Sequence, residues 1–261
     1  MIDPDTTIGT VRLTVRDLGR SRSFYERVIG LPASPPFGGL LELHGDASAP
    51  PLNRRATGLY HFAILVPSRA DLADSLKRIA AAGWPLSGAS DHLVSEALYL
   101  SDPDGNGIEI YRDRPREEWP ERDGQLQMAT IALDLDDLAR ASPGDDVPAT
   151  VPAQTRIGHV HLQVSDLDEA ERFYGGKLGF DVTVRGYPGA LFFSAGGYHH
   201  HIGVNTWHSA GSAQPEPGAV GLRNFDVVLP GAGALAETLQ RVGGNPFVHD
   251  PSGIGMRLTA A

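Results

Sequence analysis

Three side chains able to bind a metal stand at matching points of separate strand-like segments. They are His61 in GLYHFAILV, Glu109 in DPDGNGIEI and His159 in IGHVHLQV. Two imidazoles and one carboxylate form the ligand set of a divalent metal that keeps coordination positions open for other molecules. A lone carboxylate between Ile108 and Ile110 on a core strand would also be costly unless it were paired or bound to a metal. These residues therefore predict a metal centre.

Strands must bring these residues together, and the chain repeats itself in a way that indicates how. Three pairs of segments correspond: residues 8–31 with 157–180, 58–67 with 221–230, and 102–110 with 250–258. The first pair carries the dipeptide FY at the same point in both members. Two similar halves are therefore expected.

Each half contains two units in which a strand is followed by a helix and further strands. In residues 157–165 apolar and polar side chains alternate with the period of a strand, and a helical stripe follows. Later strands are separated by Gly and Pro turns. The prediction is an α+β fold of four βαβββ units, at 8–54, 58–112, 157–207 and 220–261. The corresponding domains are 1–112 and 157–261, joined by a polar, Pro-rich linker at 113–156.

Several motifs carry a resemblance to a known family. The pattern HVHLQVSDLxxAxxFYxxxLGF, followed by a His-bearing strand and by DPDGNGIEI, resembles the vicinal oxygen chelate superfamily, which includes glyoxalase I, extradiol dioxygenases and bleomycin-resistance proteins. The stretches LYHFAILVP, SEALYLSDPDGNGIEIY and GGYHHHIGVNTW are similar to the two-domain proteins described as catechol 2,3-dioxygenases. The resemblance covers nearly the whole chain outside the linker. It implies two cupped mixed sheets, with metal ligands on the first and last strands of each unit.

The ligand positions implied by this family are filled unevenly. The first-strand positions hold, in chain order, Thr10, His61, His159 and Asn224, and the last-strand positions of the second, third and fourth units hold Glu109, His201 and Arg257. Pairing of units within each half would leave two incomplete sites, and two ligands rarely hold a metal. We therefore predict that the second unit pairs with the third to form one site. The first and fourth units would form a degenerate partner site.

Strand phase supplies further candidates for the cup. In residues 199–205 the apolar side chains alternate with His199, His201 and Asn205. His201 is therefore expected to point into the cup. The activity that the resemblance implies needs a catalytic proton-transfer group, and we assign that role to His201. His199 and Asn205, together with His161, are candidates for contacts with a substrate.

The resemblance also points to Tyr99, because extradiol enzymes carry a substrate-contacting tyrosine ten residues before the glutamate ligand. We add His92 as a second catalytic candidate beside Tyr99. Aromatic residues favour strands in any case and a loop histidine is usually solvated, so both candidates are weaker than the metal ligands.

The activity implied by the resemblance is extradiol cleavage of a small aromatic diol by O2, with Fe(II) held by His61, Glu109 and His159. The position of His201 is a ligand position in glyoxalases, so a four-ligand site with Mn, Ni or Zn is an alternative. Two other functions stay open: a glyoxalase-like isomerase or lyase, and a non-catalytic protein that sequesters a drug or metabolite. The binding protein would have no need of His61 and Glu109.

Composition narrows the partners. The 261 residues carry a formal net charge of −10 and 41% apolar side chains, which favours a globular chain and disfavours nucleic acid or an anionic membrane as a partner. The chain has no cysteine, so a metal must use nitrogen and oxygen ligands. No signal-like or membrane-spanning run is evident, which predicts a cytoplasmic protein. Homo-oligomerisation is left open.

Overall fold

The computed structural model describes residues 1–34, 36–122, 125–142, 144 and 146–261. The first unit comprises β1 (Thr7–Val15), α1 (Leu18–Phe24), a π-helical turn (Tyr25–Ile29), a 3-10 segment (Pro36–Gly39) and β2 (Leu41–Gly45). The second comprises β3 (Gly58–Leu65), α2 (Arg69–Ala81), β4 (Gly88–Asp91), β5 (Ser95–Ser101) and β6 (Gly107–Asp113). The segment that follows contains a 3-10 turn (Arg116–Glu118), β7 (Glu121–Arg122), β8 (Gln125–Leu126), β9 (Ile131–Ala132) and α3 (Leu135–Arg140).

The second half also consists of two units in which a strand is followed by a helix and then by further strands. The third unit comprises β10 (Arg156–Gln163), α4 (Leu167–Glu171), a π-helical stretch (Arg172–Leu178), β11 (Asp181–Val184), β12 (Ala190–Ser194) and β13 (Ile202–Asn205). The fourth comprises β14 (Gly221–Leu229), α5 (Ala232–Val242), β15 (Phe247–His249) and β16 (Gly255–Ala260). Among the described residues, the first and fourth units thus carry fewer strands than the second and third.

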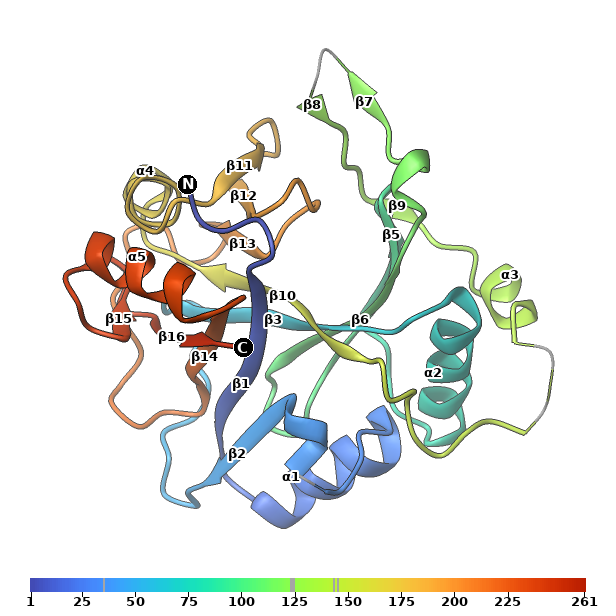
Figure 1. Ribbon diagram of the computed structural model, residues 1–261. Helices are drawn as coiled ribbons and strands as arrows, with labels where there is room; N and C mark the ends of the chain where they lie inside the picture. Colours follow the sequence, from blue (N-terminus) through green and yellow to red (C-terminus); the bar gives the residue numbers. More distant parts are fainter. Residues whose placement is uncertain (35, 123–124, 143, 145) are drawn as a thin grey trace.

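The two large sheets each combine units from different halves of the chain. One sheet has nine strands in the order β11-β12-β13-β10-β3-β6-β5-β4-β9, and the other has five in the order β15-β16-β14-β1-β2. The nine-stranded sheet joins the third unit to the second through the antiparallel pair β10 and β3, which lie side by side at the centre of Figure 1. The five-stranded sheet joins the first unit to the fourth through β1 and β14. The predicted α+β class and the crossed pairing are both confirmed.

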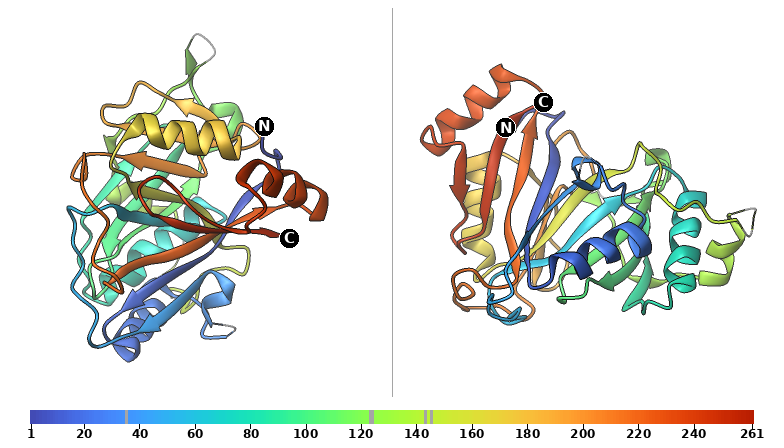
Figure 2. Two further views of the ribbon diagram at one scale, coloured as in Figure 1. Left: turned by 90° about the vertical axis from the view of Figure 1, so that its left-hand side faces the viewer. Right: turned by 90° about the horizontal axis from the view of Figure 1, so that it is seen from below.

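Helices cover the outer faces of the curled sheets (Figure 2). Their starts are capped: the Ser68 side chain accepts a hydrogen bond from the backbone N–H of Asp71 at the start of α2, and Asp166 accepts one from Glu169 at the start of α4. The π-helical stretch after α4 ends at Gly179, whose φ of 91° lies in the left-handed region that favours glycine. Within the described part of the chain, no helix has the length and apolar character needed to cross a bilayer.

The repeated FY and DP motifs explain how neighbouring units hold each other. The Tyr25 hydroxyl donates a 2.9 Å hydrogen bond to Asp102, and the Tyr174 hydroxyl donates an equivalent 2.9 Å bond to Asp250. Both tyrosines are fully buried, and each aspartate begins the turn that leads into the last strand of its unit. The first of these bonds fixes the turn before β6, the strand that carries Glu109.

Candidate metal centre and cavity

The three predicted metal ligands come from three adjacent strands of the nine-stranded sheet. Glu109 on β6 is in register with Ala63 of the parallel strand β3, and β3 in turn pairs with β10, which carries His159. Gly107 permits the close approach of β6 to β3, because a Cβ atom at this position would lie 2.1 Å from the carbonyl oxygen of Tyr60. The sheet therefore brings together residues that are far apart in sequence.

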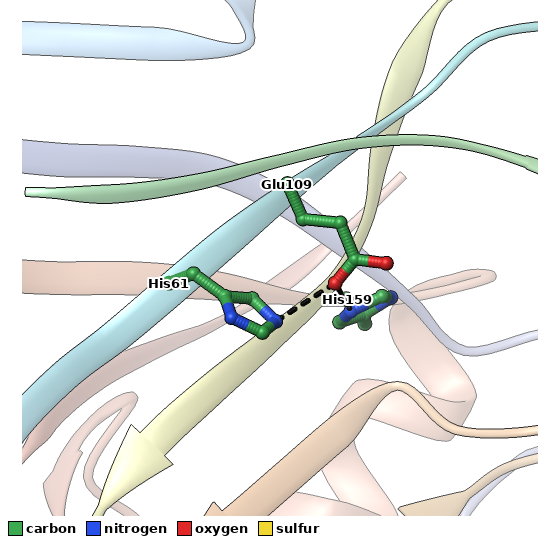
Figure 3. Close-up of side chains that lie close together, drawn as sticks. All are labelled: His61, Glu109 and His159. Carbon is green, nitrogen blue, oxygen red and sulfur yellow. Dashed lines mark hydrogen bonds and ion pairs between the residues drawn. The ribbon is translucent and has the colours of Figure 1, made fainter. Parts of the chain in front are cut away.

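The side chains of His61, Glu109 and His159 converge on one carboxylate oxygen (Figure 3). Glu109 Oε2 lies 2.9 Å from His61 Nε2 and 3.1 Å from His159 Nε2. All three residues are buried, and their ligand atoms lie within 4.8 Å of one another. Among the described residues, no other group of three His, Cys, Asp or Glu side chains meets this condition.

The donor set fits a divalent first-row metal. Bonds of about 2.1 Å place ligand atoms at right angles about 3.0 Å apart, close to the two Glu109 distances. His61 Nε2 is buried and, despite its short contact with Glu109, is not aligned for a hydrogen bond to any described residue. Such an unpartnered nitrogen is costly in a folded protein, and a metal ion would satisfy it.

The protonation states of His61, Glu109 and His159, together called the metal cluster, also favour the binding of a cation. Burial alone would raise the pKa of Glu109, but the neighbouring His159 and His61 outweigh it and hold that pKa well below its usual range. Burial lowers the pKa of His159 to about 4, although Glu109 opposes the shift. A carboxylate beside a neutral imidazole is the state in which both groups bind metals.

A cavity of about 560 Å³ opens beside these ligands. His61 and Glu109 form part of its lining, and much of the remaining wall is aromatic. The aromatic and sulfur-containing lining residues are Tyr60, Tyr99, Met128, Tyr187, Phe192 and Trp207. Arg54 also lines it, and it is the lone Lys or Arg side chain among the described lining residues. A planar, largely apolar ligand of small size fits these walls.

Tyr99 and His92 both line the cavity and form a hydrogen-bonded pair. His92 Nδ1 lies 2.7 Å from the backbone carbonyl of Ala129, which can only accept, so Nδ1 carries the proton. In the neutral imidazole, His92 Nε2 is then the acceptor for the Tyr99 hydroxyl, 2.6 Å away. Burial raises the pKa of Tyr99 well above its ordinary value, and the Glu109 charge raises it further. Tyr99 is therefore a neutral hydroxyl that already donates to His92.

His201 does not lie where the sequence placed it. It is absent from the cavity lining, and its Nδ1 accepts a 3.2 Å hydrogen bond from the backbone N–H of Ala195. The strand phase that predicted a cup-facing His201 does not apply because β13 begins only at Ile202. The bend before that strand turns the adjacent His200 into the cavity instead, and the His200 ring lies 4.1 Å from the His159 ring, centroid to centroid. Sequence reasoning missed His200 for this reason.

The three predicted substrate contacts divide in the same way. His161 lines the cavity, and its buried Nε2 has no hydrogen-bond partner among the described residues. His199 is fully buried behind the wall, where its Nε2 lies 2.9 Å from Asp113. Asn205 is also outside the lining and accepts a hydrogen bond from the backbone of Trp207. His199 and Asn205 therefore support the cavity wall without forming its surface.

Ion pairs occupy the corresponding positions of the five-stranded sheet. Arg257, which matches Glu109 in the repeat, lies 2.8 Å from Asp226. Arg12 contacts the same carboxylate at 2.7 Å and donates to Asn224, which matches His61. The Thr10 hydroxyl donates to a backbone carbonyl. Arg12, Asp226, Arg257 and Asn224 thus satisfy one another, and the described part of this sheet carries no counterpart of the metal cluster.

Comparison with known proteins identifies the family. Residues 7–110 and 156–254 match the model of the Glyoxalase/Bleomycin resistance protein/Dioxygenase superfamily. The chain belongs to this superfamily. A relative named catechol-2,3-dioxygenase, from Bacillus subtilis (strain 168), is 48% identical over 245 residues, which cover 88% of this chain and 85% of the relative. The family resemblance noted in the sequence is therefore confirmed.

Solved structures support the superfamily fold. A protein of Bacillus subtilis subsp. subtilis str. 168 that carries a provisional dioxygenase name has a TM-score of 0.64 at 14% identity, covering 97% of this chain and 84% of its own. Glyoxalase I from Zea mays has a TM-score of 0.56 at 14% identity, covering 97% of this chain and 92% of its own. At this level of identity the likeness concerns the fold alone.

Proposed function

We propose that the protein is an extradiol ring-cleaving dioxygenase that acts on a catechol-type diol with Fe(II). The observation that carries this proposal is the convergence of His61 and His159 on one Glu109 oxygen beside a cavity that also holds the Tyr99–His92 pair. The superfamily and the relative named catechol-2,3-dioxygenase support the same activity. Two histidines and one carboxylate leave several coordination positions of a six-coordinate metal free.

The chain's own residues then have distinct tasks. When bound, the metal supplies acidification of the diol hydroxyls and a position for O2. Tyr99 donates to His92, so its oxygen has lone pairs available to accept a hydrogen bond from a diol hydroxyl. His200, which lines the cavity beside His159, is placed to accept or return a proton during ring opening. We assign to His200 the proton-transfer role that the family resemblance had suggested for His201.

The cavity walls favour a substituted diol. Tyr60, Trp207 and His161 form edge-to-face or tilted ring contacts with centroid separations of 5.2 to 5.4 Å. Such a wall binds an aromatic ring or an apolar substituent. Arg54 adds a positive charge to this wall and thereby favours a substituent with a carboxylate.

The test is ring cleavage by the protein loaded anaerobically with Fe(II). Addition of a substituted catechol and then air should consume one O2 per diol and give the ring-opened product, while metal-free protein should do neither. A protein that retains Fe(II) and binds the catechol but consumes no O2 would disprove the proposal. Conversion of a hemithioacetal without O2 would assign the site to glyoxalase-like isomerisation.

A further inference from the structure

A line of three polar side chains runs from the cavity toward the surface behind it. His200 Nδ1 lies 2.7 Å from His199 Nδ1, and His199 Nε2 lies 2.9 Å from Asp113 Oδ1. Asp113 is the last residue of β6, the strand that carries Glu109, and its side chain is 24% exposed, whereas His199 is fully buried. The metal cluster and this line therefore share a strand.

With His199 as a neutral imidazole, hydrogen-bond chemistry fixes the proton positions along the line. A carboxylate can only accept, so His199 Nε2 carries a proton toward Asp113. A neutral His199 then has a bare Nδ1, which accepts the proton on His200 Nδ1. A neutral His200 with a protonated Nδ1 has its lone pair on Nε2. At the cavity, the line thus ends in His200 Nε2, a proton acceptor on a residue of the lining.

We propose that Asp113 and His199 are positioning residues that hold His200 in the tautomer with a bare Nε2, ready to accept a proton from a cavity ligand. The inference rests on the proposed function for the part of His200 in turnover, but the tautomer itself can be measured without any reaction. When His200 takes up a proton, the Asp113 carboxylate also serves as a counter-ion for the new positive charge. This counter-ion lies away from the metal cluster.

The neighbouring tyrosine offers a matched control. The Tyr198 hydroxyl also contacts Asp113, at 3.0 and 3.1 Å, and contacts the Tyr111 hydroxyl at 2.7 Å, but it makes no hydrogen bond to either histidine of the line. Tyr198→Phe therefore removes a hydrogen bond to Asp113 in the same buried region and leaves the contacts between Asp113, His199 and His200 in place.

The experiment combines a spectrum with kinetics on the full chain. Two-bond ¹⁵N–¹H correlation spectra of metal-free protein, with the His200 signals assigned from a His200→Gln variant, should show a protonated Nδ1 and a bare Nε2. His199→Phe and Asp113→Leu should lose this pattern, whereas Tyr198→Phe and Asp113→Asn, whose amide oxygen still accepts, should keep it. In Fe(II)-loaded protein, His199→Phe should lower kcat about 10- to 100-fold, the usual effect of removing such a supporting partner, with iron content and KM nearly unchanged.

Each result decides the matter. A wild-type spectrum with the proton on His200 Nε2 would overturn the inference, as would the unchanged tautomer and kcat of a folded His199→Phe variant. An equal loss of kcat in Tyr198→Phe would also overturn it, because general damage to this buried region would then explain the effect. Absence of ring cleavage in the wild type would refute the proposed function, while the spectra would still test the tautomer.

Discussion

The His200 ring lies against the ring of His159, with centroids 4.1 Å apart and planes tilted by 47°. This contact places a further imidazole next to the metal cluster without making it a member, since the group of possible ligands contains His61, Glu109 and His159. Burial lowers the pKa of His200 well below its ordinary value, with a further contribution from His159. His200 is therefore neutral in the resting protein, as a proton acceptor must be.

Replacement of His200 should impair turnover more than metal binding. We expect His200→Gln to keep near-stoichiometric Fe(II) and to lose about 10²-fold or more in kcat, the usual contribution of a positioned proton-transfer group. His201→Gln is the control, because His201 lies outside the cavity lining and its Nδ1 accepts from the backbone of Ala195. Iron analysis and steady-state kinetics on both variants provide the measurement. A larger loss of kcat in His201→Gln would restore the original assignment.

The amount of bound metal should depend on the charge of the side chain at position 109 but not on that at position 257, the corresponding position of the repeat. We expect Glu109→Gln to lose most of its bound metal, because the variant removes the shared oxygen charge between His61 and His159. Arg257→Ala should retain wild-type metal content, since Arg257 pairs with Asp226 and its side chain is 49% exposed. Elemental analysis of anaerobically purified proteins measures both. Equal metal content in wild type and Glu109→Gln would remove the argument for this site.

The sequence was sufficient for the placement of whole strands but not for the direction of every side chain. The uneven distribution of ligand-type residues predicted the crossed pairing of β3 with β10, because chemistry required a third ligand. Strand phase failed at His201, one residue before β13 begins, where a bend replaces the alternation. Periodicity carries information within a strand and none beyond its end.

Parts of the cavity wall could not have been predicted in this way. Met128 and Thr130 come from the segment interpreted as a linker, and Tyr187 and Trp207 come from loops. The Thr130 and Tyr187 hydroxyls lie 2.8 Å apart, although 57 residues separate them. Such contacts depend on how far the sheet curls, which no local pattern records.

Tyr99 and His92 should act as one unit. Because the Tyr99 hydroxyl donates to His92 Nε2 at 2.6 Å, removal of either partner breaks the same interaction. We expect Tyr99→Phe and His92→Gln each to lower kcat by about 10²-fold. The double variant should be no more than about threefold worse than the slower single variant. Multiplication of the two effects would show that the residues act independently.

Stability should fall in mild acid because His201 is buried in its neutral form. Burial, with repulsion from His199 and His159, lowers the His201 pKa to about 3 in the folded protein. An unfolded histidine has a pKa of about 6.5, so between these values the unfolded chain binds a proton that the folded chain excludes. The free energy of unfolding should therefore decrease as pH falls below about 6.5, by up to about 1.4 kcal/mol per pH unit from this residue.

Chemical unfolding of metal-free protein at pH 7, 6 and 5 measures this dependence. Other buried histidines add to the total slope, so the contribution of His201 is the difference between wild type and His201→Gln. In the variant, the free energy of unfolding should decline less steeply with acidification. The difference in slope should correspond to the uptake of up to one proton on unfolding. Parallel curves for the two proteins would contradict the assignment of a neutral buried His201.

Arg54 should set a preference for diols with a negatively charged substituent. It is the lone Lys or Arg among the described lining residues, and its Nη2 is held 3.1 Å from the carbonyl oxygen of Gly105. Because Arg54 is exposed, its attraction for a carboxylate is about 1 kcal/mol, equivalent to about fivefold in affinity. Arg54→Gln should therefore raise KM about fivefold for a carboxylate-bearing catechol and leave KM for an uncharged alkyl catechol unchanged.

Arg55→Gln is the matched control, since the neighbouring exposed Arg55 is not part of the lining. The wild-type preference should also weaken at high salt, as exposed charges are screened. An equal rise in KM for both substrates would assign Arg54 to the shape of the cavity and would remove charge as the basis of selectivity.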